Sequence, residues 1–118
     1  MIEAVNPDEL REGRLQRLRI LIGHHARAQA ERDYLDEFKR SKLAILMREF
    51  ERAGIETVAA QEREARAHPD YLQLLEGLRA AVEEAERLRW ELKLEEMRFE
   101  AWRTTQANQR QEKARYGT

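Results

Sequence analysis

The chain has 118 residues, and its 22 Lys and Arg nearly balance its 23 Asp and Glu. Charged residues make up 38% of the chain, and it contains no cysteine, which excludes a disulfide framework and a thiolate metal site. Because Gly and Pro are scarce and Glu, Arg, Ala and Leu are strong helix formers, the composition predicts long helices. No apolar run approaches the roughly 20 residues of a membrane helix. The first ten residues lack a secretory pattern, so we expect a cytoplasmic protein with no membrane contact.

The first predicted helix is long and covers residues 14–53. Residues 1–13 are expected to form an N-terminal cap region, in which Asn6 caps, Pro7 takes the first helical position and Gly13 interrupts the opening turn. Gly54, in the left-handed conformation, is expected to end the long helix. Its apolar stripe, read mainly in steps of four residues, is predicted as Leu15, Leu18, Ile22, Ala26, Ala30, Tyr34, Phe38, Ile45, Phe50 and Ala53.

A connector over residues 54–68 follows, with a short helix that Thr57 caps and His68 ends, because a residue before proline avoids the helical region. Pro69 opens a second long helix over residues 69–106, and residues 107–118 are expected to form a flexible basic tail. Glu95 and Glu96 interrupt the apolar stripe of this second helix. The stripe is predicted as Tyr71, Leu74, Leu75, Leu78, Ala81, Val82, Ala85, Leu88, Leu92, Phe99 and Trp102.

The predicted fold is all-α: a single domain over residues 1–118, built as a long two-helix hairpin with a short connecting helix. Two such helices leave much of each apolar stripe uncovered when they pair only with each other. We therefore expect a homo-oligomeric helical bundle, in preference to a long coiled coil, because the heptad fit is imperfect. The oligomer interface is predicted at Leu78, Val82, Leu88, Leu92, Phe99 and Trp102.

The sequence offers little for catalysis. His24 and His25 point about 100° apart on a helix, so they do not converge on one metal ion. Carboxylates spaced by four residues, such as Glu91 and Glu95, alternate with basic residues and are typical of a solvated helix face. No phosphate-binding loop or nucleophile elbow is present, and Ser41 is the only serine. We expect no enzyme activity, no catalytic residue, no metal site and no cofactor.

The charge is unevenly distributed. Residues 11–27 contain five Arg and one Glu, residues 76–100 contain eight acidic and five basic residues, and residues 101–118 contain four basic residues and one acidic. These runs are either solvated faces held by ion pairs or surfaces that contact phosphate. On the second interpretation, the basic ends bind nucleic acid through Arg11, Arg14, Arg17, Arg103, Arg110, Lys113 and Arg115.

Two segments, EREARAHPDYLQLLEGL (62–78) and EMRFEAWRTTQANQR (96–110), together with the helix between them, resemble phage-encoded recombination mediators of the UvsY type. The resemblance implies a non-enzymatic oligomer that binds single-stranded DNA and helps a recombinase displace the single-strand-binding protein. It places Arg98, Trp102, Arg103 and Arg110 in the shared terminal motif. The acidic balance of the second helix departs from what DNA binding requires, unless that face is turned away.

The expected function is therefore an oligomeric single-stranded DNA-binding protein that acts as a phage recombination mediator or recombinase loader. The alternative is a structural or adaptor helical-bundle protein that binds only protein partners. A third interpretation is a small regulator or inhibitor from a mobile element. Binding to nucleic acid that weakens with salt distinguishes the first interpretation from the second.

Overall fold

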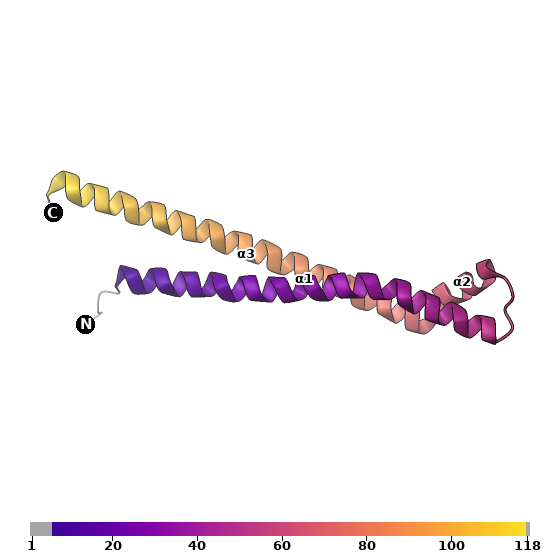
Figure 1. The fold of residues 1–118 in the computed structure, drawn as a ribbon. Helices are drawn as coiled ribbons and strands as arrows, with labels where there is room; N and C mark the ends of the chain where they lie inside the picture. The colour runs from indigo at the N-terminus through magenta and orange to yellow at the C-terminus, as the bar shows by residue number, and fades with distance from the viewer. Residues whose placement is uncertain (1–5, 118) are drawn as a thin grey trace. The chain divides into compact units, whose positions relative to one another are not determined.

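The computed structural model describes residues 6–117, and within them the chain forms three α-helices and no strand (Figure 1). The helices are α1 (Pro7–Arg52), α2 (Val58–Ala67) and α3 (Pro69–Tyr116). The prediction of an all-α chain with two long helices and a short connecting helix is confirmed. The helix ends differ from the prediction at both ends of the chain.

Helix α1 begins at Pro7 rather than at residue 14. The Asn6 side chain accepts a hydrogen bond from the Asp8 amide at 2.8 Å, so Asn6 caps the helix as predicted. Gly13 lies inside the helix and does not interrupt it, because one glycine costs only about 1 kcal/mol relative to alanine in a helix interior. Residues 1–5 of the predicted cap region lie outside the described residues.

The connector between α1 and α3 follows the local sequence signals. Gly54 adopts a φ of +102°, in the left-handed region that favours glycine, and so ends α1 as predicted. Thr57 Oγ1 accepts a hydrogen bond from the Ala60 amide at 3.2 Å and caps α2, and His68 follows its last residue. The buried Gln61 side chain donates to the Ile55 carbonyl at 2.8 Å, which ties α2 to the loop before it.

Helix α3 continues to Tyr116, so the prediction of a flexible tail is wrong for residues 107–116. These residues are all exposed, and they contain mainly Gln, Ala, Glu, Lys and Arg. Such residues extend an existing helix readily, because each added residue gains a hydrogen bond without a new nucleation step. The tail is therefore a helical surface.

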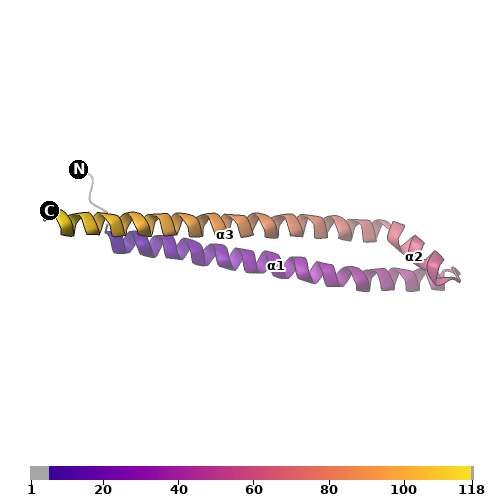
Figure 2. The same ribbon diagram turned by 90° about the horizontal axis from the view of Figure 1, so that it is seen from above.

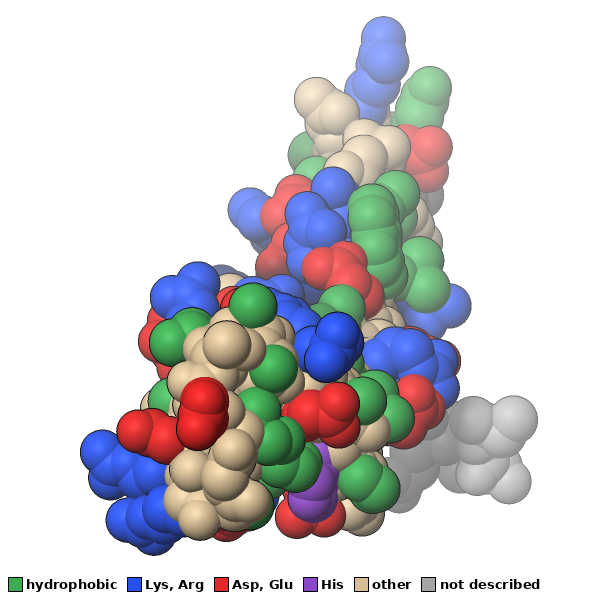
Figure 3. Space-filling view, turned by 90° about the vertical axis from the view of Figure 1, so that its right-hand side faces the viewer, with side chains coloured by type: hydrophobic (Ala, Val, Ile, Leu, Met, Phe, Trp, Pro, Cys, Tyr) green, Lys and Arg blue, Asp and Glu red, His purple; other side chains and the backbone are tan. Residues whose placement is uncertain are grey.

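By its internal contacts the chain divides into two compact units: a connector unit of residues Ala26–Glu86, and a terminal unit of residues Met1–His25 and Arg87–Thr118. In the connector unit, Leu46, Ala65 and Tyr71 form a buried core, and neighbours from α1 and α3 pack against it. Here α1 and α3 run antiparallel, since Lys42 Nζ lies 3.8 Å from Asp70 Oδ2 while α2 joins their ends (Figure 2). Seen from the α2 side, acidic, basic and hydrophobic side chains are intermixed (Figure 3).

The less exposed residues of both long helices recur in alternating steps of three and four, an average of 3.5. On α3 this seam largely matches the predicted stripe. On α1 the predicted stripe is wrong at Ile22, Tyr34 and Ile45, which are 53%, 61% and 48% exposed, whereas Leu15, Leu18, Phe38 and Phe50 are partly buried. A four-residue step turns a helix by about 400°, so repeated steps of four drift around it. The observed α1 seam contains Leu18, Leu21, His25, Ala28, Arg32, Leu35, Lys39, Lys42 and Leu46.

Candidate nucleic-acid interface

The terminal unit pairs the first part of α1 with the last part of α3 in antiparallel orientation. Arg17 Nη1 lies 3.8 Å from Glu95 Oε1, and the Arg14 guanidinium lies over the Trp102 ring, 5.4 Å from its centroid. From the first contact to the second, the residue on α1 moves from 17 back to 14 while its partner on α3 moves from 95 on to 102, so the two helices run antiparallel. This pairing brings the N-terminal and C-terminal basic runs of the sequence into one unit.

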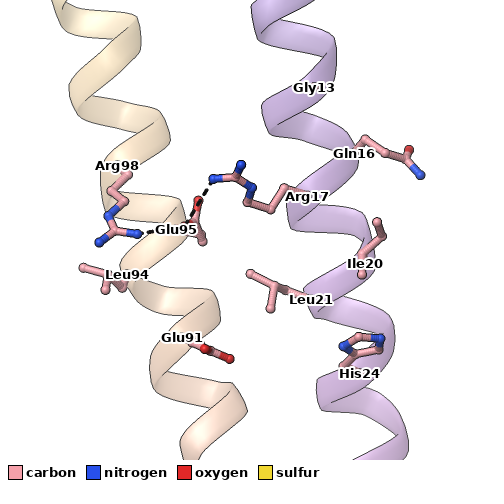
Figure 4. A pocket seen from close by; sticks show the side chains of 10 residues that line it. All are labelled: Gly13, Gln16, Arg17, Ile20, Leu21, His24, Glu91, Leu94, Glu95 and Arg98. Atoms are coloured by element: carbon pink, nitrogen blue, oxygen red, sulfur yellow. Dashed lines mark hydrogen bonds and ion pairs between the residues drawn. The ribbon is translucent and has the colours of Figure 1, made fainter.

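Glu95 lies where the sequence predicted an interruption in the apolar stripe of α3, yet the row of less exposed residues continues through it. Its side chain is only 13% exposed, and it receives Arg17 from α1 and Arg98 from its own helix, the latter at 3.0 Å (Figure 4). A carboxylate between two guanidinium groups can occupy a seam position because its charge is compensated there. Glu96, the next residue, is exposed. The helix pairing therefore continues to Trp102 without a rotation of α3.

The two units carry opposite charge. The described residues of the terminal unit (6–25 and 87–117) include twelve Lys and Arg against eight Asp and Glu. The connector unit has ten basic residues against fourteen acidic ones. The acidic balance that weakened the DNA interpretation is thus concentrated in the connector unit, while the terminal unit has a net charge of +4. A positive potential at the terminal unit favours anionic partners.

Four of the seven predicted nucleic-acid-binding residues line one hollow of about 560 Å³ in the terminal unit, which we call the basic hollow. Arg11 comes from α1, and Arg103, Arg110 and Lys113 come from α3. These residues are up to 102 positions apart in the sequence, and the antiparallel pairing brings them together. Two acidic residues, Asp8 and Glu100, also line the hollow, and they leave the cations in excess.

Most of the cations of the basic hollow are available to a ligand. Arg11, Arg110 and Lys113 are exposed and form no ion pair with another described residue. Arg103 donates to Glu100 Oε1 at 3.2 Å, an exposed pair within one helix that contributes little to stability. Trp102 is partly buried at the side of the hollow, and Arg14 covers its ring. The hollow therefore suits contact with phosphate groups more than base stacking.

The other three predicted cations lie elsewhere. Arg14 is partly buried and lies over the Trp102 ring, so this contact joins α1 to α3. Its buried Nε has no hydrogen-bond partner among the described residues, which offsets part of that stabilisation. Arg17 pairs with Glu95 on the seam. Arg115 is exposed in the last turn of α3 and does not line the hollow.

The residues predicted for the oligomer interface mostly face their own chain. Leu88 is 5% exposed, and Trp102 packs beneath Arg14 of α1. Leu78, Leu92 and Phe99 are partly buried on the same face of α3. Val82, at 40% exposure, lies off this face. That these residues form an oligomer interface stays a prediction.

Residue-by-residue sequence reasoning missed the amide side chains of the hollow. Gln106 and Gln109 line it beside the cations and can donate to phosphate or to base edges. Their role depends on the register between the two helices, which places Arg11 opposite this part of α3. The alternating spacing of the two seams was the signal that could have indicated this register.

A second groove of the terminal unit, of about 620 Å³, contains charges of both signs. Arg17, Glu95 and Arg98 meet there with Ile20, His24 and Leu94 around them (Figure 4). Within residues 6–117 no group of three or more His, Asp and Glu is arranged to hold a metal ion. This groove carries neither the cation excess nor the ligand-binding geometry that would mark it as a separate site.

Comparison with protein-family models, curated proteins and solved structures finds no significant match to this chain. Over the described part of the chain, no helix combines the length and the apolar character needed to cross a membrane.

Proposed function

We propose that this chain binds single-stranded nucleic acid through the basic hollow of its terminal unit, and that it acts without catalysis. The observation that carries the proposal is the meeting of Arg11 with Arg103, Arg110 and Lys113 at one hollow. Three of these four cations have no ion-pair partner among the described residues, so their charge is available to phosphate groups. Lys and Arg contacts to the phosphate backbone supply most of the affinity in binding that does not depend on sequence.

The basic hollow favours a single strand over a duplex. Its cations line a concave hollow of about 560 Å³, near the start of α1 and along the last part of α3. Gln106 and Gln109 add neutral donors that can reach the edges of unstacked bases. A flexible single strand can follow such a concave, positively charged surface.

The resemblance to UvsY-type mediators supports a more specific proposal, in which the chain loads a recombinase onto DNA covered by single-strand-binding protein. Three of the motif residues, Trp102, Arg103 and Arg110, line the basic hollow, while Arg98 pairs with Glu95 at the second groove. Self-association would bring several hollows onto one strand and raise the affinity through multivalency. Stimulation of a recombinase on coated DNA, compared with uncoated DNA, tests this role.

Fluorescence anisotropy with a labelled single-stranded oligonucleotide at low salt tests the binding proposal. The double variant Arg110→Glu and Lys113→Glu should weaken binding by at least tenfold, because it replaces two available cations of the hollow with anions. A matched control, Arg40→Glu and Arg48→Glu, makes the same change in net charge at exposed residues of the connector unit. Equal loss in both variants would show that only net charge matters, and absence of binding by the unmodified chain would reject the proposal.

A further inference from the structure

An apolar stripe on the outer face of α3 is left uncovered by the other described residues, 6–117. It consists of Trp90, Leu94, Met97 and Ala101, and the first three are 56%, 45% and 63% exposed. Their spacing of four, three and four residues places them on one side of the helix. Leu88 and Leu92, which belong to the seam facing α1, each lie about 200° around the helix from Trp90. Figure 4 shows Leu94 leaving α3 on the side away from α1.

The spacing of this outer stripe is the heptad spacing by which helices pack against other helices. Twelve residues span about 17 Å along the helix axis, enough for about three turns of contact. Exposed Trp, Leu and Met in contiguous positions mark an interaction surface more often than isolated apolar residues do. The outer stripe lies wholly within the terminal unit.

The charged residues beside the outer stripe identify its partner. Glu91 and Arg98 lie along one edge, and Lys93 and Glu100 lie along the other. When two identical helices pack antiparallel, each edge meets the same edge of the second helix, with its order reversed. Glu91 then faces Arg98 of the second copy, and Lys93 faces Glu100 of the second copy. By symmetry this gives four pairs of opposite charge.

Parallel packing of the same stripe would bring opposite edges together. Lys93 would then face Arg98 of the second copy, and Glu86 would face Glu91, so like charges would meet in both places. Like-charge contacts beside a helix interface select against that orientation. The charge pattern is thus complementary to a second copy in the antiparallel orientation.

We propose that the outer stripe of α3 binds the outer stripe of a second copy of this chain, with the two α3 helices antiparallel. The contact is symmetric and closed, so it produces a dimer and no open chain. Of the existing pairs in this region, Arg87 with Glu91 and Arg103 with Glu100 are exposed pairs within one helix and can be shared with the second copy at little cost. Arg98 also pairs with Glu95, but its side chain is 58% exposed and a guanidinium has five N–H donors, so it can contact a second carboxylate as well. Lys93 lies over the Trp90 ring, 5.2 Å from its centroid, and covers part of the apolar surface.

This inference deepens the self-association on which the multivalent form of the proposed function rests. The dimer joins two terminal units and so places two basic hollows in one assembly. The outer stripe shares no residue with the three cations of the hollow that lack ion pairs among the described residues. Variants can therefore change either of them while leaving the other intact.

Sedimentation velocity of the full chain over a concentration series tests the surface. The double variant Leu94→Ala and Met97→Ala should raise the dimer dissociation constant at least tenfold. The control Ile22→Ala and Ile45→Ala removes exposed apolar side chains from α1 and should change it less than twofold. Alanine maintains the helix, and circular dichroism checks that it does. A chain that stays monomeric at every concentration, or equal effects of both variants, would overturn the proposal.

Charge variants test the orientation. Arg98→Glu places two carboxylates together in the antiparallel dimer, so it should weaken association, and adding Glu91→Arg should restore it. In a parallel dimer Arg98→Glu would instead face Lys93 and strengthen association, which would overturn the orientation. Because the chain has no cysteine, Ala101→Cys adds a second test. The antiparallel contact separates the two thiols by about 17 Å along the axis, so disulfide-linked dimers should not form.

The two proposals fail separately. Arg110→Glu with Lys113→Glu should reduce oligonucleotide binding and leave the dimer unchanged. Leu94→Ala with Met97→Ala should weaken the dimer at least tenfold and leave a weaker oligonucleotide binding by the monomer at low salt. A chain that dimerises as proposed but binds no oligonucleotide would reject the nucleic-acid function and keep the interface.

Discussion

The salt dependence of nucleic-acid binding gives the most quantitative test of the basic hollow. Its four cations, Arg11, Arg103, Arg110 and Lys113, set the number of phosphate contacts that one chain can make there. For single strands, the logarithm of the binding constant falls with the logarithm of salt concentration by about 0.7 per contact. Four contacts give a slope of about −2.8, and the affinity should fall about 50-fold between 50 and 200 mM salt.

The perturbation is the double variant Arg11→Gln and Arg110→Gln, which removes one cation from each helix. Two contacts remain, so the slope should change to about −1.4 and the loss over the same salt range to about sevenfold. Arg40→Gln with Arg48→Gln, in the connector unit, should leave the slope unchanged. Fluorescence anisotropy titrations at four or five salt concentrations give each slope directly.

Two results of the salt titrations would contradict a role for the basic hollow. If removal of cations from α3 makes the salt slope less steep, but removal of Arg11 alone leaves the slope unchanged, then the two basic runs do not act on one strand. If the slope of the unmodified chain is near zero, phosphate contacts do not drive binding. Either result would refute the argument that the antiparallel pairing creates the site.

Three further predictions concern the packing and the charges. Leu46→Ala should lower the free energy of unfolding, measured by chemical denaturation, by about 2–5 kcal/mol, because Leu46 is 1% exposed and fills the core of the connector unit. A loss of less than about 1 kcal/mol would contradict that placement. Glu95→Leu should leave the free energy of unfolding unchanged or raise it, because Arg17 is 64% exposed and can turn to solvent. A strongly destabilised variant would instead show that the ion pair between Arg17 and Glu95 holds the two helices together. Hydrogen bonds from Arg79 lower the pKa of the Glu76 carboxyl, so NMR titration should find it below that of an ordinary glutamate, and Arg79→Gln should raise it. Because the folded-state pKa is lowered, the stabilising effect of this pair is present above the unfolded-state pKa and is lost as the pH falls through the folded-state value; an unchanged pKa in the variant would exclude Arg79 as the cause.

The positions of the helix ends could be predicted where neighbouring residues determine them. Asn6 and Thr57 cap their helices as the sequence indicates, and Gly54 ends α1 with a positive φ. Pro69 begins α3 directly after His68. Each of these features depends on hydrogen bonds or steric limits within three or four residues, so a short segment of sequence contains all the information.

The α1 seam and the course of α3 past Glu95 could not be derived in the same way. The predicted α1 stripe followed apolar residues and chose Ile22 and Tyr34, whereas the observed seam includes His25 and Arg32. Polar side chains enter a seam when the opposite helix supplies a partner, as Arg17 does for Glu95. Hydrophobicity along one helix does not reveal that partner.

Some features of the candidate site could be predicted from the sequence, and others required the tertiary structure. The sequence by itself determined that both ends of the chain are basic and that the chain is helical, because composition and local spacing fix both properties. Only the tertiary structure decided that Arg11 lines the same hollow as Arg110, and that Arg14 and Arg17 contact the opposite helix. That distinction depends on the register of two helices whose contacting residues are about 80 or more positions apart, and register is set by the sum of many weak side-chain contacts along the whole seam.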